Sequence, residues 1–144
     1  MQTVTSSDGA RIACQTVGQG PALVIVHGSL STHRNYSRLV DKLAETFTVT
    51  IYDRRGFGES AYDGAVSMEQ DLDDLACVVE AAACDRVFGY SLGGIIALAG
   101  AVRMPGVRKL AFYEPPLFPS REAAAPSWRA STGSWARARP PPPS

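Results

Sequence analysis

The stretch VFGYSLGG at residues 87–94 places Ser91 between two glycines, in the spacing Gly-x-Ser-x-Gly. A serine at the tip of a sharp strand-to-helix turn has a strained backbone, so the residues two positions to either side must be small. Residues 86–90 have the character of a short strand, and residues 92–103 are apolar nearly all round. This context favours a nucleophile-bearing turn over a plain tight turn with a solvated serine, and it predicts a central, covered helix after Ser91.

Strands and helices alternate on both sides of this stretch. Residues 3–18 alternate apolar and polar positions around an Asp-Gly pair, which predicts an N-terminal antiparallel hairpin. The run ALVIV at residues 22–26 is typical of a strand buried on both faces of a mostly parallel sheet. Further strands are predicted over 47–53, 86–90 and 107–113, and helices over 32–47, from Ser67 onward and over 92–103. Gln70 completes a capping box with Ser67, and the alternation predicts a doubly wound α/β sheet.

The tripeptide HGS at residues 27–29 directly follows the ALVIV strand. A loop at this place can present the backbone N–H of Ser29 toward Ser91. Together with the N–H of Leu92, it would then hold an oxyanion that forms on a substrate. The alternative is an ordinary turn at the end of a strand.

We expect structural roles for both histidines of the chain and for Asp53, which follows a predicted strand. His27 is expected to bond to the backbone at the end of its strand. His33 is the other candidate for a base, but it is expected to begin a helix, which favours a structural role. In DRRGFGES at residues 53–60, two glycines allow a tight turn near the carboxyl edge of the sheet, where ligands of α/β proteins bind. Asp53 is interpreted as a turn-stabilising carboxylate rather than a catalytic one.

The order of HGS, DRRGFGES and GYSLGG resembles that of the alpha/beta-hydrolase superfamily, and most of all its compact bacterial esterases, lactonases and cofactor-independent haloperoxidase-like enzymes. FYEPP at residues 112–116 is similar to the end of the sixth strand in such proteins, and the resemblance covers residues 1–118. It implies a serine hydrolase that acts on a small-molecule ester or related acyl substrate. By resemblance, Ser91 is the nucleophile, and the backbone N–H groups of Ser29 and Leu92 form the oxyanion hole.

The chain departs from this family after Ser91. Family members carry their catalytic acid and histidine later in the chain than the serine. After Ser91 there is no histidine or aspartate, and the carboxylates are Glu114 and Glu122. We therefore expect an impaired enzyme in which no residue is in place to take the serine proton. The alternatives are a non-catalytic remnant or binding module, and one half of a complex whose partner supplies the acid and the histidine.

The composition changes at about Pro119. Residues 119–144 contain no Val, Ile, Leu, Met, Phe, Tyr, Lys or Asp, and they finish RARPPPPS. We expect residues 1–118 to form the N-terminal part of an incomplete alpha/beta-hydrolase domain and residues 119–144 to be a disordered tail. A change of reading frame in GC-rich DNA is one explanation of the switch, and a native tail is the other.

The net charge and the cysteine content limit which partners and cofactors the sequence predicts. The 14 basic and 14 acidic residues give a net charge of zero, which offers no electrostatic case for binding nucleic acid or an anionic membrane. Apolar runs are too short to span a bilayer, and the polar N-terminus lacks the features of a signal peptide. Three cysteines without metal or disulfide spacing, and a Gly18-Gln19-Gly20 that leads into a strand, predict neither a metal nor a dinucleotide cofactor. A cytoplasmic protein is the default expectation, and the oligomeric state stays open.

Overall fold

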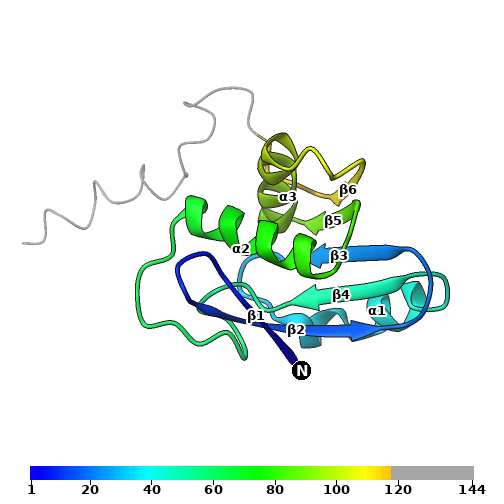
Figure 1. The fold of residues 1–144 in the computed structure, drawn as a ribbon, viewed down its shortest axis with the longest axis horizontal. Coiled ribbons are helices and arrows are strands. Elements are labelled where there is room, and N and C mark those ends of the chain that lie inside the picture. The colour runs from blue at the N-terminus through cyan, green and yellow to red at the C-terminus, as the bar shows by residue number, and fades with distance from the viewer. Residues whose placement is uncertain (118–144) are drawn as a thin grey trace, which may run out of the picture.

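The computed structural model describes residues 1–117, which form a six-stranded sheet with helices on both faces (Figure 1). The strands are β1 (Gln2–Thr5), β2 (Arg11–Val17), β3 (Ala22–Val26), β4 (Thr48–Tyr52), β5 (Arg86–Tyr90) and β6 (Lys109–Tyr113). The helices are a short 3₁₀ helix η1 (His33–Tyr36), α1 (Ser37–Leu43), α2 (Met68–Ala81) and α3 (Leu92–Arg103). The strand order is β1-β2-β4-β3-β5-β6. The first two pairings are antiparallel and the other three are parallel, which confirms the predicted hairpin followed by a mostly parallel sheet.

Alternate residues of the central strand β3 face opposite layers, as the period of a strand requires. Val24 and Val26 lie in a core cluster with Leu72 of α2 and Ile96 of α3. Ile25 points the other way, into a second cluster that includes Val40 of α1, Val49 and Ile51. Because both faces are covered by helices, the run ALVIV is apolar throughout, as predicted.

A local signal sets the start of α2. The Ser67 side chain accepts a hydrogen bond from the Gln70 backbone N–H at 3.2 Å, and the Gln70 side chain accepts one from the Ser67 N–H at 3.1 Å. This reciprocal pair is the predicted capping box.

The helix predicted over residues 32–47 is shorter than expected. It begins as the 3₁₀ helix at His33, continues as α1 and ends at Leu43. The following backbone is packed tightly against two glycines of another loop: a Cβ on Gly18 would lie 2.3 Å from the Phe47 carbonyl oxygen, and one on Gly20 would lie 2.1 Å from the Thr46 oxygen. The close approach fixes residues 44–47 as a turn that leads into β4 instead of a further helical turn.

The helix after Ser91 is not covered on all sides, so that prediction is wrong for the described residues. Leu98 is 37% exposed and Val102 is 86% exposed. The buried side of α3 packs against the sheet and α2, and no described element lies over its outer side. The strand predicted over 107–113 begins two residues later, at Lys109, and among residues 1–117 it pairs with β5 alone.

The predicted disordered tail over residues 119–144, and residue 118 at the predicted domain boundary, lie outside the described residues. Within residues 1–117, no helix is long and apolar enough to cross a membrane. No group of three or more histidine, cysteine or acidic residues that could hold a metal ion occurs in that part of the chain.

Candidate active site

Ser91 occupies the sharp turn between β5 and α3, with φ 50° and ψ −121°. Positive φ is strained for any residue other than glycine and often marks functional turns. Two backbone hydrogen bonds hold the turn: the Ser91 N–H donates to the Tyr113 carbonyl at 2.9 Å, and the Gly94 N–H donates to the Ser91 carbonyl at 2.8 Å. The strained strand-to-helix turn predicted at this position is therefore present.

The two glycines of the Gly-x-Ser-x-Gly spacing lie where backbone segments nearly touch. A Cβ on Gly89 would be 2.4 Å from the Gly93 carbonyl oxygen, and one on Gly93 would be 2.2 Å from the Val26 oxygen. Both distances are shorter than any real contact of a Cβ atom. Glycine at these positions lets the start of α3 lie directly against the ends of β3 and β5.

The HGS loop lies beside this turn because β3 and β5 are neighbouring parallel strands. Their carboxyl ends meet at one edge of the sheet, and a Cβ on Gly28 would lie 3.3 Å from the Cβ of Ser91. Neither the Ser29 N–H nor the Leu92 N–H has a partner among the hydrogen bonds of residues 1–117. The Gly28 N–H differs, since it donates to the Tyr36 hydroxyl at 3.1 Å.

His27 is fully buried and is bonded to the backbone through both ring nitrogens. Its Nε2 accepts a hydrogen bond from the Arg54 backbone N–H at 2.9 Å, so the proton resides on Nδ1 and is donated to the Gly28 carbonyl at 2.8 Å. Burial lowers the pKa of His27 below its ordinary value of 6.5 and keeps the ring neutral. The ring thus orients the peptide that precedes Ser29 and has no free nitrogen for proton transfer.

His33 begins η1, as predicted, and is paired with Asp53 on the loop after β4. One Asp53 oxygen accepts from the His33 backbone N–H at 2.7 Å, and the other lies 2.8 Å from His33 Nδ1 and 2.9 Å from the Glu59 N–H. Burial alone would raise the pKa of Asp53, but the hydrogen bonds from Glu59 and His33 outweigh burial and hold that pKa below 3.8. Asp53 therefore stabilises the turn, as interpreted from the sequence.

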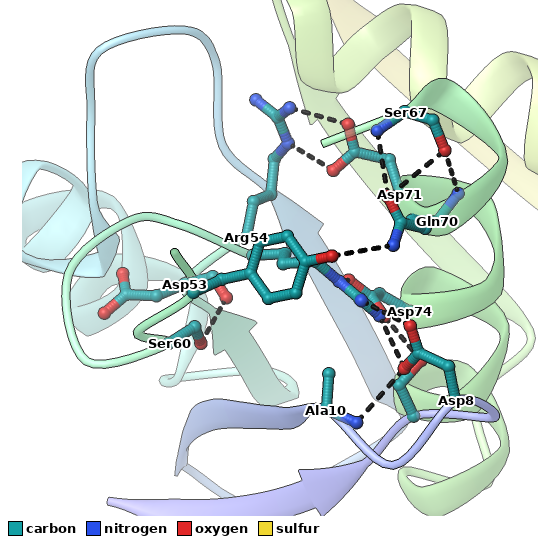
Figure 2. A network of polar contacts seen from close by, with 12 residues as sticks. Asp8, Ala10, Asp53, Arg54, Ser60, Ser67, Gln70, Asp71 and Asp74 are labelled. Atoms are coloured by element: carbon teal, nitrogen blue, oxygen red, sulfur yellow. Dashed lines mark hydrogen bonds and ion pairs between the residues drawn. The ribbon is translucent and has the colours of Figure 1, made fainter. Parts of the chain in front are cut away.

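A network of buried ion pairs holds the loop after β4 against α2 (Figure 2). Arg54 donates to both carboxylate oxygens of Asp71, at 2.9 and 2.7 Å. Arg55 donates twice to Asp74, at 3.0 and 2.6 Å, and also reaches Asp8 in the turn of the N-terminal hairpin. Hydrogen bonding by Arg55 holds the pKa of the Asp8 carboxyl well below its usual range. The partners of this network lie 17 to 47 residues apart and leave no local pattern in the sequence from which it could be predicted.

Three tyrosines line the region around the turn. The rings of Tyr36 and Tyr90 pack edge to face with centroids 6.0 Å apart, and Tyr90 and Tyr113 are stacked at 5.9 Å. The Tyr36 hydroxyl contacts Gly28, and the Tyr113 carbonyl accepts from Ser91. The candidate site therefore has an aromatic wall, and the spacing of these tyrosines in the sequence does not predict it.

Comparison with known proteins agrees with the fold described above. Residues 23–144 match the family model described as "Alpha/beta hydrolase family". The solved structure of an alpha/beta hydrolase from Sphaerobacter thermophilus has a TM-score of 0.78 and 38% sequence identity, and the alignment covers 94% of this chain and 54% of that one. For a putative aryl esterase from Burkholderia cenocepacia the TM-score is 0.69 and the identity 25%, covering 77% of this chain and 45% of that one.

Curated relatives are similar over a shorter share of their length. A pimeloyl-[acyl-carrier protein] methyl ester esterase of Stenotrophomonas maltophilia strain R551-3 is 36% identical over 98 residues, which are 67% of this chain and 37% of the relative. The protein of the same description from Vibrio atlanticus is 40% identical over 82 residues, 56% of this chain and 30% of the relative. The chain thus spans about a third of the length of these curated relatives.

Proposed function

The chain belongs to the alpha/beta hydrolase family, and from this premise we propose that Ser91 is the nucleophile of an esterase-type site. The observation that carries the proposal is the strained backbone of Ser91, at φ 50°, between a parallel strand and the first residue of α3. Strain of this kind costs about 1–3 kcal/mol and persists where the surrounding structure imposes it for function. The reaction class is hydrolysis of a small-molecule ester or related acyl compound.

In this proposal the Ser91 hydroxyl attacks the carbonyl carbon of the ester. The negative charge that develops on the carbonyl oxygen is stabilised by the backbone N–H groups of Ser29 and Leu92. Leu92 belongs to the first turn of α3, where N–H groups have no partner within the helix and the helix dipole favours negative charge. His27 acts indirectly, because its ring fixes the Gly28 carbonyl and so the orientation of the peptide bond that carries the Ser29 N–H.

Proton transfer is the step that this site performs poorly. The nucleophile needs a base to take its proton, and later an acid to protonate the leaving alkoxide. In the structure, His27 has both nitrogens bonded to the backbone and His33 is paired with Asp53. We infer an impaired enzyme, whose oxyanion hole and substrate binding alone retain about 10³–10⁴-fold catalysis over water.

The aromatic wall supports an acyl or alkyl group of apolar character on the substrate. Tyr36, Tyr90 and Tyr113 offer flat apolar surface next to the serine, with ring contacts that keep the three side chains together. Tyr36 accepts the Gly28 N–H through its hydroxyl oxygen, so its own proton is free to donate to a polar atom of the substrate.

A fluorophosphonate probe tests the proposal on the purified chain, with imidazole added as an external base. We expect slow labelling of Ser91 without imidazole, acceleration as imidazole is added, and no labelling of the Ser91→Ala variant. Absence of labelling even at high imidazole would contradict the nucleophile. Rapid stoichiometric labelling without imidazole would instead show that the chain contains its own base, with His33 as the first residue to substitute.

A non-catalytic binding role is the second candidate, favoured by the engagement of both histidines in structural bonds. It predicts that ester analogues bind equally well to the original chain and to Ser91→Ala, and that imidazole produces no turnover. Calorimetric titration of both proteins with a non-hydrolysable ester analogue separates this role from an impaired enzyme.

A further inference from the structure

The outer side of β6 presents unpaired backbone groups and apolar side chains. Within residues 1–117, β6 lies at the end of the sheet and pairs only with β5. Its residues Phe112 and Tyr113 are 43% and 57% exposed. An exposed edge of this kind is a template for pairing with another strand.

The hydrogen bonds to β5 reveal which backbone groups of β6 face outward. The Lys109 N–H donates to Asp85, and the Tyr113 carbonyl accepts from Ser91, so the odd-numbered residues of the strand face β5. Because successive residues of a strand point their backbone groups to opposite sides, the N–H and C=O groups of Leu110 and Phe112 face outward. Two residues of β6 are therefore ready to accept a further strand.

The segment around β6 is basic at one end and acidic at the other, so two copies that run in opposite directions have complementary charges. The sequence RKLAFYE, residues 108–114, is basic at its start and ends in an aromatic residue and a carboxylate. Two copies arranged antiparallel about Ala111 bring Arg108, which precedes the strand in each copy, to the end of the other copy's strand, where Glu114 follows. The same arrangement places Lys109 opposite Tyr113, which avoids a pair of like charges and permits a cation–π contact.

The alternation of outward-facing and inward-facing backbone groups along β6 selects the same register. A two-fold axis through Ala111 brings Leu110 of one copy opposite Phe112 of the other, and both carry outward-facing groups, so four backbone hydrogen bonds form. If the two-fold axis passed between two residues, each residue with outward-facing groups would lie opposite a residue whose groups face β5. No backbone hydrogen bonds would then form between the two copies. Axes through neighbouring residues shorten the overlap, whereas the axis at Ala111 uses the whole strand from Lys109 to Tyr113.

One face of the sheet beside β6 carries an apolar groove that such pairing extends. The groove has a volume of about 320 Å³, and its apolar lining includes Leu39 and Leu43 of α1 together with Phe88 and Ala111. Lys109 also lines the groove. Tyr113 lies on the same face of the sheet, because Lys109, Ala111 and Tyr113 are alternate residues of β6. Pairing about Ala111 continues this face across the two copies and brings Tyr113 of the second copy next to Lys109 at the groove.

We propose that β6 pairs antiparallel with β6 of a second copy of this chain, across a two-fold axis at Ala111, so that two six-stranded sheets form one continuous sheet. The occupant of the edge is thus another molecule of the same sequence. An isologous contact of this kind closes after two copies and leaves no further β6 edge for growth.

Disulfide trapping tests the register. Residues opposite each other in a non-hydrogen-bonded antiparallel pair have Cα atoms about 4.5 Å apart, within the range of about 4.4–6.8 Å that a disulfide spans. Ala111→Cys is therefore expected to form a covalent dimer under mild oxidation. Lys109→Cys and Tyr113→Cys alone should stay uncrosslinked, whereas an equimolar mixture of the two should crosslink. The original chain, with Cys14 and Cys84 buried and Cys77 half-buried, is the control.

Light scattering after size-exclusion chromatography gives a second, independent readout. The chain is expected at twice its 15.3 kDa. Phe112→Pro removes an outward N–H in each copy and should weaken dimerisation by about tenfold or more, whereas the matched Phe112→Ala keeps that N–H and should retain the dimer. Circular dichroism checks that both variants are folded.

Three outcomes would overturn the proposal. A monomer at all concentrations is one, and a dimer equally tolerant of Phe112→Pro and Phe112→Ala is another. The third is crosslinking at Lys109→Cys alone but not at Ala111→Cys, which would assign the edge to a different register.

Discussion

Ser91 adopts a conformation that most residues avoid, and the neighbouring backbone imposes it. Its N–H and C=O groups are both engaged, by Tyr113 and by Gly94. The glycines on either side allow α3 to begin directly against two strands, with no room for a methyl group at Gly89 or Gly93. The position of Ser91 at this turn therefore depends on glycines that let three backbone segments pack closely.

Replacing Gly93 should be far more damaging than replacing a glycine in open space. A Cβ at position 93 would lie 2.2 Å from the backbone oxygen of Val26, so backbone must shift, whereas a Cβ at Gly106 would meet nothing within 4 Å. We expect Gly93→Ala to lower the free energy of unfolding by about 2–4 kcal/mol and Gly106→Ala to change it by less than about 0.5 kcal/mol. Urea denaturation followed by circular dichroism compares them, and equal midpoints would contradict the packing described for α3.

Buried neutral His27 predicts a stability that depends on pH. Its pKa in the folded chain is lowered from 6.5 by burial, so the unfolded chain takes up a proton first as the pH falls. This contribution to stability is complete above about pH 6.5 and is lost below it, by up to about 1.4 kcal/mol per pH unit. His27→Gln retains an acceptor for the Arg54 N–H and does not titrate, so its stability should vary less between about pH 6.5 and 5.

Thermal unfolding of both proteins across this range measures the difference. The Asp53 carboxyl has a pKa lowered from 3.8, so its own loss of stability occurs at lower pH than that window. Parallel curves for the original chain and His27→Gln would show that His27 accepts a proton in the folded state.

At the scale of elements, the loop after β4 is fixed by charges that are almost completely buried. Arg55 and Asp74 are 1% and 0% exposed, and Asp74 also accepts from the Ser6 hydroxyl. Such a pair gives little net stability over an apolar pair of the same shape, but removing Asp74 takes two hydrogen bonds from the buried Arg55 charge and leaves it with Asp8 alone. The pair thus fixes where the loop lies against α2.

Asp74→Ala should therefore lower the free energy of unfolding by about 3–5 kcal/mol. The matched control is Glu45→Ala, which removes the partner of Lys42 in a pair whose side chains are 61% and 75% exposed; its cost should be below about 1 kcal/mol. Denaturant titrations of the two variants give the comparison. Similar losses in both would mean that burial does not govern the strength of these ion pairs.

Elements with a local signature were predictable from the sequence, and long-range pairings were not. The hairpin, the ALVIV strand and the Ser67 capping box each depend on residues close together in the chain. The bond between His33 and Asp53 joins positions 20 residues apart, and neither residue type alone signals the other. The shorter helix before β4 and the exposed side of α3 depend on which segments pack nearby, and the hydrophobic period does not record that.

On the scale of the whole molecule, the two ends of the sheet differ. At one end the hairpin turn is tied to the remainder of the chain through Arg55 and Asp8, so that an edge strand lies next to a buried polar network. At the other end β6 carries exposed aromatic residues and an adjoining apolar groove. Within residues 1–117, then, one edge of the sheet lies beside buried charges and the other beside exposed apolar surface.

The hydrogen bond from the Ser91 N–H to the Tyr113 carbonyl couples the serine turn to the end of the edge strand β6. When that end of the strand opens, this hydrogen bond of the turn is lost. Native proteins open locally, and outermost strands open at lower free energy than central ones. Each time the end of β6 separates from β5, the Ser91 amide is released to solvent.

Its hydrogen should therefore exchange with deuterium at the rate of β6 opening, and faster than the amide of Ile25 in the central strand. Covering the outer edge of β6 should slow this exchange. A Ser91 amide as protected as that of Ile25, with β6 uncovered, would mean that the turn is held independently of its neighbour. If the Ser91 amide does exchange faster, the fraction of time that Ser91 spends in its strained conformation depends on how firmly the end of β6 is held against β5.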